Sequence, residues 1–401
     1  MTVETMIKMM QDPMGIPFYA PVFQVLLVLT FALHILFVNF ALGTLSVSIY
    51  GYIRGEANWL RLASSLAKAT TTNISLAMLF GVAPLLFVQV LYDPFWYTSN
   101  LLSAVWVIGF VFIMMIAYGL TYVFYLKGGP KKGIPVVFGI VALVLFIIAG
   151  VIMHALGYQL LQPEKWLEWY VRQGKVDTSG SVLHAFQLPR FLHFLVPSFA
   201  MTGLFLMLYA WYFRHRSDFT EDYLIWVGKL GAKMAFLFTT IQVIVGFWWL
   251  LSLPSTLAFT TNPVFLVALF FGVTFLFFLY YIQGDPIRYA VSSIPMALLT
   301  IGTMAYARET LRTKYLASFG YTIFRYKTNL DWGSTVLFFL TFVVGLVVVG
   351  YFLATVYKAG KSRETYEATA FMNRWGKLSI ALLLVWLAVV VTFGLVITLR
   401  S

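Results

Sequence analysis

The sequence predicts an all-α fold, a polytopic bundle of about ten membrane-spanning helices. Of its 401 residues, 61% are hydrophobic and only 10% are charged, whereas a soluble domain carries roughly 25% charged residues. The apolar residues gather in long runs, and about 20 such residues are enough for a helix to cross a bilayer. We therefore predict an integral membrane protein that forms one domain over residues 1–401, with no linker to a second domain.

Ten runs are long enough to span a membrane, and several exceed the minimum length, which favours tilt or extension beyond the bilayer. The predicted helices cover residues 19–52, 65–92, 100–126, 133–158, 188–213, 223–252, 263–282, 287–310, 333–358 and 374–399. Turn signals separate them in chain order. These signals are Asp93-Pro94 after the second helix, Pro130 before the fourth, Pro163 after it, Pro254 and Pro263 around the next outer loop, and Asp285-Pro286 before the eighth.

The longest connection, residues 159–187, has the composition of an interfacial amphipathic helix. Aromatic and charged side chains alternate closely in its first part, which contains Glu164, Lys165, Trp166, Glu168, Trp169 and Tyr170. We expect this segment to lie on the membrane surface.

Basic residues orient the predicted bundle, because loops on the cytoplasmic side carry an excess of Lys and Arg. Most of the 27 basic residues lie near the loops after the odd-numbered helices, namely Arg54, Arg61, Lys68, Lys127, Lys131, Lys132, Arg214, Arg216, Lys229, Lys233, Arg288, Lys358, Lys361, Arg363, Arg374 and Lys377. This bias places both termini outside a bacterial or archaeal cytoplasmic membrane. The net charge of +12 is read as this orientation signal and not as nucleic-acid binding. Residues 1–17 lack the pattern of a removable signal peptide.

Histidines and one glutamate suggest a site toward the outer side. These residues are His34, His154, His193 and Glu309, within helices that are otherwise apolar or small, and His184, in the loop just before the fifth helix. Imidazole and carboxylate groups are costly to bury in a membrane, so they usually mark a path or a cofactor. The chain has no cysteine, which excludes iron–sulfur clusters, thiolate zinc, disulfides and covalently attached haem within it. Haem iron with imidazole ligands is the predicted chemistry.

Each candidate has a predicted role. His193, His34, Glu309 and His154 are candidate iron ligands, while Arg190, Arg308 and Arg312 are candidate partners of the haem propionates. Arg190 precedes His193 by three residues, so both can lie on one helix face. Six glycines would leave room for a macrocycle or for close helix packing: Gly43, Gly81, Gly109, Gly150, Gly203 and Gly272.

Structural alternatives remain open for the same residues. A buried histidine could simply bond a neighbouring carbonyl, and Glu309 could pair with Arg308 or Arg312. His184 is read as a loop residue and His215, on the inner side, as a solvated one.

At these residues the chain resembles subunit I of cytochrome bd-type quinol oxidases. The segment from Phe31 to Phe37 is similar to the family's first helix, in which the residue matching His34 is a high-spin haem ligand. The segment from Arg190 to Phe194 is similar to its fifth helix, in which the residue matching His193 ligates low-spin haem b. Glu309 and Arg312 keep the core of a family signature, which implies a ligand role for Glu309.

The chain also departs from that family. The methionine that is the second ligand of the low-spin haem has no counterpart in residues 263–282, so His154, with Met234 behind it, is the candidate replacement. The quinol-binding loop is reduced to residues 253–262, and the helix 100–126 has no carboxylate for a proton path. The signature after Arg312 continues differently, and a tenth helix is added.

Three functions follow as hypotheses. The first is a haem b subunit of a quinol oxidoreductase complex, which exchanges electrons between quinol or quinone and an outer-side cytochrome c or iron–sulfur protein. The second is a terminal bd-type quinol oxidase, against which the missing carboxylates and the short loop argue. The third is a haem-free scaffold or transporter. Other membrane subunits and the lipid bilayer are expected partners, and nucleic acid is not.

Overall fold

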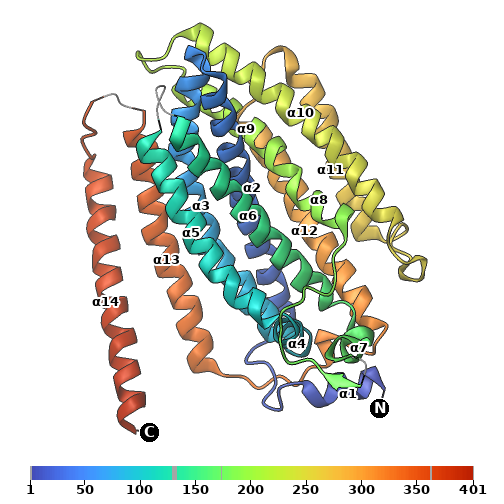
Figure 1. Ribbon diagram of the computed structural model, residues 1–401. Helices are drawn as coiled ribbons and strands as arrows, with labels where there is room; N and C mark the ends of the chain where they lie inside the picture. The colour runs from blue at the N-terminus through green and yellow to red at the C-terminus, as the bar shows by residue number, and fades with distance from the viewer. Residues whose placement is uncertain (1, 129–132, 173, 362–363, 401) are drawn as a thin grey trace.

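The computed structural model describes residues 2–128, 133–172, 174–361 and 364–400, and this part of the chain is a bundle of long helices (Figure 1). The predicted all-α class is confirmed. Helix α1 and the last turns of α14 lie at the same end of the bundle, which is called the terminal end below. Lys131, Lys132 and Arg363, which contribute to the predicted charge bias, lie outside the described residues.

Within the described ranges, nine spans are long and apolar enough to cross a membrane. The helices that form them are α2 (Ala20–Arg54), α3 (Ala57–Leu91), α5 (Ala104–Lys127), α6 (Gly133–Gln159), α8 (Leu188–Leu195) with α9 (Pro197–Phe213), α10 (Glu221–Leu251), α11 (Pro263–Tyr281), α13 (Trp332–Ala359) and α14 (Ala370–Arg400). Each matches one predicted run, although α3 begins eight residues before its predicted start.

The eighth predicted helix, 287–310, is present with shifted bounds but is not among these nine spans. It forms α12 (Ser293–Ala317), because the residues after Asp285-Pro286 make turns before the helix begins. Its second half carries Arg308, Glu309 and Arg312, so it falls below the hydropathy of a spanning helix. α12 packs against α11 and α2, and therefore places these charged side chains inside the protein.

Short elements cover the terminal end. They are α1 (Val3–Met10), α4 (Asp93–Leu102), α7 (Trp166–Tyr170), the strands β1 (Val171–Arg172) and β2 (Lys175–Val176), and 3-10 turns at Pro163–Lys165, Ser255–Leu257 and Ile323–Arg325. A further 3-10 turn, Ile282–Gly284, follows α11 at the opposite end of the bundle. The amphipathic helix predicted within 159–187 is thus only one short turn of helix followed by an antiparallel hairpin. Trp166 is buried there and donates to the carbonyl oxygen of Gln159, which anchors the segment.

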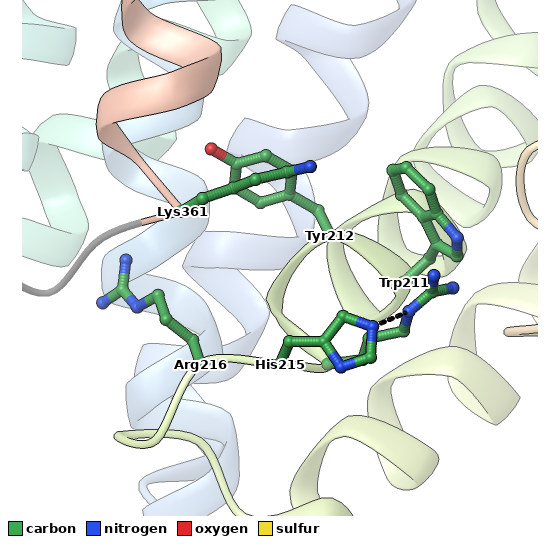
Figure 2. Close-up of a pocket in the computed structure, with 6 residues that line it drawn as sticks. Trp211, Tyr212, His215, Arg216 and Lys361 are labelled. Atoms are coloured by element: carbon green, nitrogen blue, oxygen red, sulfur yellow. Dashed lines mark hydrogen bonds between the residues drawn. The ribbon is translucent and has the colours of Figure 1, made fainter. Parts of the chain in front are cut away.

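Helices α13 and α14 form a hairpin at the edge of the bundle (Figure 1). In the most apolar stretch of each of these two helices, only 6% of the residues are buried within the protein. Lipid or another membrane subunit must therefore cover the remainder. At the end opposite the termini, the Tyr212 hydroxyl donates to the carbonyl oxygen of Tyr357 and Arg216 donates to that of Gly360, which ties the hairpin to the bundle. Basic residues surround a small pocket at this place (Figure 2).

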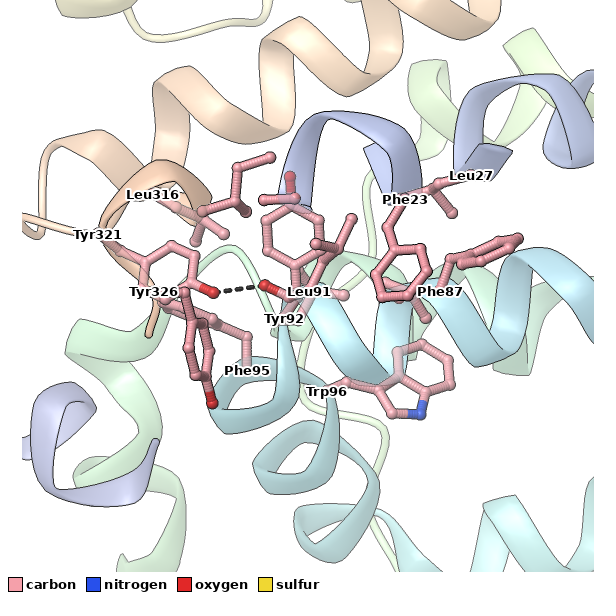
Figure 3. Close-up of a cluster of buried hydrophobic side chains, with 14 of the residues drawn as sticks. Phe23, Leu27, Phe87, Leu91, Tyr92, Phe95, Trp96, Leu316, Tyr321 and Tyr326 are labelled. Carbon is pink, nitrogen blue, oxygen red and sulfur yellow. Dashed lines mark hydrogen bonds between the residues drawn. The ribbon is translucent and has the colours of Figure 1, made fainter. Parts of the chain in front are cut away.

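An aromatic core closes the terminal end (Figure 3). Tyr92 and Phe95 are fully buried where α3 meets α4. Tyr321 packs against both rings, at centroid distances of 6.0 Å and 4.7 Å, and its hydroxyl donates to the carbonyl oxygen of Leu91. This packing fixes the position of Tyr92, whose hydroxyl reaches the candidate site.

Candidate functional site

A hydrogen bond holds the His34 ring against α3 and fixes which ring nitrogen carries the proton. Its Nδ1 lies 2.8 Å from the carbonyl oxygen of Ala77. A carbonyl oxygen only accepts, so Nδ1 carries the proton and, in the neutral ring, Nε2 keeps its lone pair. Histidines that bind metal through one nitrogen usually donate from the other in this way.

Gly81 makes room for that imidazole. A Cβ atom at this position would lie 2.8 Å from Cε1 of His34 and 2.9 Å from its Nδ1. Such distances are shorter than side chains tolerate, so the ring packs directly on the backbone of α3. The sequence predicts that Gly81 allows close helix packing or leaves room for a macrocycle, and the group that lies beside it is the His34 ring.

His193 lies where the fifth predicted helix is broken into α8 and α9. Pro197 has no N–H and cannot donate to the carbonyl oxygen four residues earlier, which belongs to His193. Gln242 of α10 supplies the missing donor, because its Nε2 lies 2.8 Å from that oxygen. The same nitrogen lies 2.9 Å from Nδ1 of the His193 ring. With the amide in this orientation, the neutral ring carries its proton on Nε2.

A large apolar cavity opens beside His193. Its empty space is about 1460 Å³, a volume that includes the open side of the cavity. Aliphatic and aromatic side chains form most of its wall, and the polar groups that interrupt it are Asn39, His193, Thr239, Gln242, Thr300 and Arg308. The cavity therefore offers an apolar interior with a few polar contacts.

Three arginines gather near the terminal end. Arg190 and Arg312 are buried, while the guanidinium of Arg308 lies 4.1 Å above the ring of Phe31 at the cavity. Arg190 donates to the carbonyl oxygen of Gly157 through one terminal nitrogen. Buried nitrogens of all three side chains have no hydrogen-bond partner among the described residues: NH1 of Arg190, Nε of Arg308 and NH1 of Arg312. NH1 of Arg190 and Nε of Arg308 remain available to an anionic group, whereas NH1 of Arg312 lies in an ion pair with Glu309.

Glu309 is the one described carboxylate that forms an ion pair with these arginines. Its Oε1 accepts from the Tyr92 hydroxyl at 2.5 Å, and its Oε2 lies 3.0 Å from NH1 of Arg312. The contact between Oε2 and NH1 does not have hydrogen-bond geometry, so neither of these two atoms forms a hydrogen bond among the described residues. The pairing alternative for Glu309 thus describes the observed contact, and its ligand role stays a prediction.

His154 and Met234 are placed less favourably. Nε2 of His154 accepts the backbone N–H of Gln187 at 3.2 Å, and the ring packs against Phe186 and Phe191. Neither His154 nor Met234 lines the cavity. Met234 precedes Gln242 by two helical turns, about 12 Å along α10, and packs with Leu206 and its neighbours. The proposed pairing of His154 with His193 therefore has no geometric support here.

The other two histidines lie where the sequence suggested. His184 is in the connection before α8 and stacks on Trp169 at a centroid distance of 5.1 Å. His215 is at the opposite end of the bundle and accepts from Nε of Arg214.

Sequence reasoning missed Gln242 and Tyr92. Pro197, four residues after His193, signals an unpaired carbonyl oxygen, but the sequence cannot identify its donor on α10. Tyr92 lies 217 positions from Glu309, so only folding brings the two together. Among the described residues, no three His, Asp or Glu side chains form a metal-binding cluster.

No family model and no curated protein matches the chain. Among solved structures it is similar to a chain of the bd oxidase from Geobacillus thermodenitrificans, with a TM-score of 0.65 and 12% sequence identity. The match covers 84% of this chain and 97% of that chain. The chain therefore has a bd oxidase-like fold.

Proposed function

We propose that this chain is a haem b-binding membrane subunit that transfers electrons between quinol or quinone and a redox partner on its outer side. The observation that carries the proposal is the contact between His34 and Ala77, which leaves Nε2 of a membrane-buried imidazole with a lone pair for iron. The fold of a bd oxidase, which the chain shares, makes a respiratory role the first choice.

The residues present fit a haem. His34 would be an axial ligand. The nitrogens of Arg190 and Arg308 that have no hydrogen-bond partner among the described residues, together with Arg312 beside Glu309, would receive the propionate carboxylates. The large apolar cavity beside His193 suits a macrocycle or a quinone ring. Bound haem would supply one-electron chemistry at its iron.

His193 requires one adjustment for a ligand role. Rotation of the Gln242 amide would place its oxygen near Nδ1, so that the ring proton moves there and Nε2 becomes free. Amide orientation is assigned from the hydrogen-bond network, and here the carbonyl oxygen of His193 favours the observed one. We therefore place His34 before His193 as a ligand, and Glu309 and His154 after them.

A terminal quinol oxidase is the second candidate. The similarity to a bd oxidase, over 97% of that chain, favours it. The lack of any carboxylate between Leu101 and Tyr125 argues against it, because reducing oxygen requires protons at a buried site. The outer-side cytochrome c or iron–sulfur partner of the first proposal rests on the chain's lack of cysteine alone.

The test is a pyridine haemochrome assay with reduced-minus-oxidised spectra on the purified protein and on His34→Ala and His193→Ala. We expect haem b in the wild type and the loss of about one equivalent in His34→Ala. His215→Ala, a histidine at the opposite end, serves as the control and should keep its haem. A haem d band with oxygen consumption would favour the oxidase. Intact wild-type protein without haem would contradict both and leave a scaffold or transporter.

A further inference from the structure

A second pocket lies at the end of the bundle opposite the termini, between the last turn of α9 and the last turn of α13 (Figure 2). It encloses about 350 Å³ of empty space and is lined by Trp211, Tyr212, Arg214, His215, Arg216 and Lys361. These residues take no part in the proposed haem site. The pocket brings together two segments of the chain that are about 145 positions apart.

The pocket has more positive charge than its own residues neutralise. Arg216 is fully engaged, because two of its nitrogens donate to Asp218 at 2.7 Å and NH1 donates to the carbonyl oxygen of Gly360 at 2.9 Å. These bonds from Arg216 lower the pKa of Asp218 to about 2, so this carboxylate stays ionised and committed to Arg216. Among the described residues, no carboxylate forms an ion pair with Arg214 or Lys361.

The unused polar groups of the pocket are mainly donors. Nε of Arg214 donates to Nε2 of His215 at 2.8 Å, so the neutral His215 ring keeps a donor at Nδ1. The Tyr212 hydroxyl and Arg216 already occupy the backbone oxygens of Tyr357 and Gly360. The terminal nitrogens of Arg214 and the ammonium of Lys361 are exposed, and no carboxylate among the described residues forms an ion pair with either.

Aromatic rings place the pocket at the membrane boundary. The guanidinium of Arg214 lies 5.0 Å from the ring of Trp211, and the Lys361 ammonium lies 4.5 Å from the ring of Tyr357. Trp and Tyr gather at the level of lipid headgroups, and both rings belong to the last turns of spanning helices. Basic pockets between membrane helices bind anionic headgroups at this depth.

We propose that this pocket binds a phosphate group, held by Arg214 and His215 of one segment and by Lys361 of the other. Its depth favours the phosphate of an anionic lipid over free phosphate. Such a lipid would tie the α13–α14 hairpin to the bundle, where few direct contacts do so. The inference does not depend on haem binding.

The test is native mass spectrometry and thermal unfolding of the whole protein in detergent, with phosphatidylglycerol, phosphatidylcholine or inorganic phosphate added. We expect phosphatidylglycerol to stay bound and to raise the unfolding temperature. Phosphatidylcholine should bind less tightly, because the two cations repel its ammonium group. In the double variant R214Q/K361Q, affinity for phosphatidylglycerol should fall roughly 25-fold, about fivefold for each cation.

Two further variants keep the test decisive. R288Q/K127Q removes the same charge from exposed positions at the same end of the bundle and should bind as the wild type does. R214K/K361R retains the charges and should retain most of the binding, which separates charge loss from misfolding. If inorganic phosphate raises the unfolding temperature as much as phosphatidylglycerol does, the result would support the phosphate site and assign it to the free anion. Equal binding of all three additives, or equal losses in both glutamine variants, would overturn the proposal.

Discussion

The side-chain amide of Gln242 donates to the backbone oxygen of His193 at 2.8 Å and lies 2.9 Å from Nδ1 of the same residue. One side chain thus satisfies the carbonyl oxygen that Pro197 leaves unpaired and sets the proton position on the ring. Gln242 is therefore a positioning residue for His193, both for the break between α8 and α9 and for any ligand role of the imidazole.

Replacing Gln242 with Leu should destabilise the protein by about 1–3 kcal/mol, because the carbonyl oxygen of His193 would be buried without a donor. The measurement is the midpoint of thermal unfolding in detergent. Thr240→Val is the matched control, since the Thr240 hydroxyl bonds only to the oxygen of Phe236 in its own helix. Equal midpoints for the two variants would contradict the role given to Gln242.

Replacing Gly81 with Ala should displace the His34 ring, because the new Cβ would lie 2.8 Å from Cε1. Overpacking of this kind costs about 1–3 kcal/mol. If His34 binds haem, the Soret band should shift or weaken as well. Gly109→Ala on α5 is the control, since a Cβ there meets no atom within 4 Å. A Gly81→Ala protein with unchanged stability and spectrum would show that the ring has more freedom than this contact implies.

Glu309→Gln should lower the free energy of unfolding far more than Glu56→Gln does. Glu309 is buried with Arg312, and breaking a buried pair typically costs about 3–5 kcal/mol, because the remaining charge has no partner. Glu56 pairs with Arg54 at the surface, where the side chains are 58% and 49% exposed, and such pairs contribute about 0–1 kcal/mol. Thermal unfolding of the two variants measures the difference. Similar midpoints would indicate that Arg312 finds another anion, such as a bound propionate.

Docking of the N-terminal segment should strengthen as the pH falls. Asp93 accepts from the Tyr326 hydroxyl at 2.6 Å and from the backbone N–H of Asp12 at 2.9 Å. Burial raises the pKa of Asp93 above its ordinary value of 3.8. At a pH between the ordinary and the raised pKa of Asp93, the docked state therefore binds more protons than the undocked state. The stability of the docked state rises as the pH falls through the raised pKa.

Tryptic cleavage after Lys8, compared at about pH 5 and about pH 8, measures this docking. Asp93→Asn should remove the difference in protection, while Asp12→Asn, which changes an exposed carboxylate, should preserve it. The same pH dependence in the wild type and in Asp93→Asn would assign the effect to another group.

The sequence determined the fold class and the approximate helix positions because both depend on local properties, namely the length of each apolar run and the prolines between runs. At α12 it predicted the helix but with bounds shifted by about six residues, and the charges of Arg308, Glu309 and Arg312 lower its hydropathy. It failed at 159–187, where an amphipathic composition does not require a long helix. Among the residues it singled out, His154, Arg190, Glu309 and Arg312 are buried, and His34, His193 and Arg308 are half-buried. Their roles stay predictions.

Only the tertiary structure decided what these residues touch. The contacts of His34 with Ala77, of Glu309 with Tyr92 and of His193 with Gln242 join residues between 43 and 217 positions apart. These hydrogen bonds decide which nitrogen of each histidine carries the proton and which atoms still lack a partner. The order of residues in the sequence does not encode such contacts. The sequence thus identified the side chains that are costly to bury, and the packing of the helices decided which neighbours stabilise each of them there.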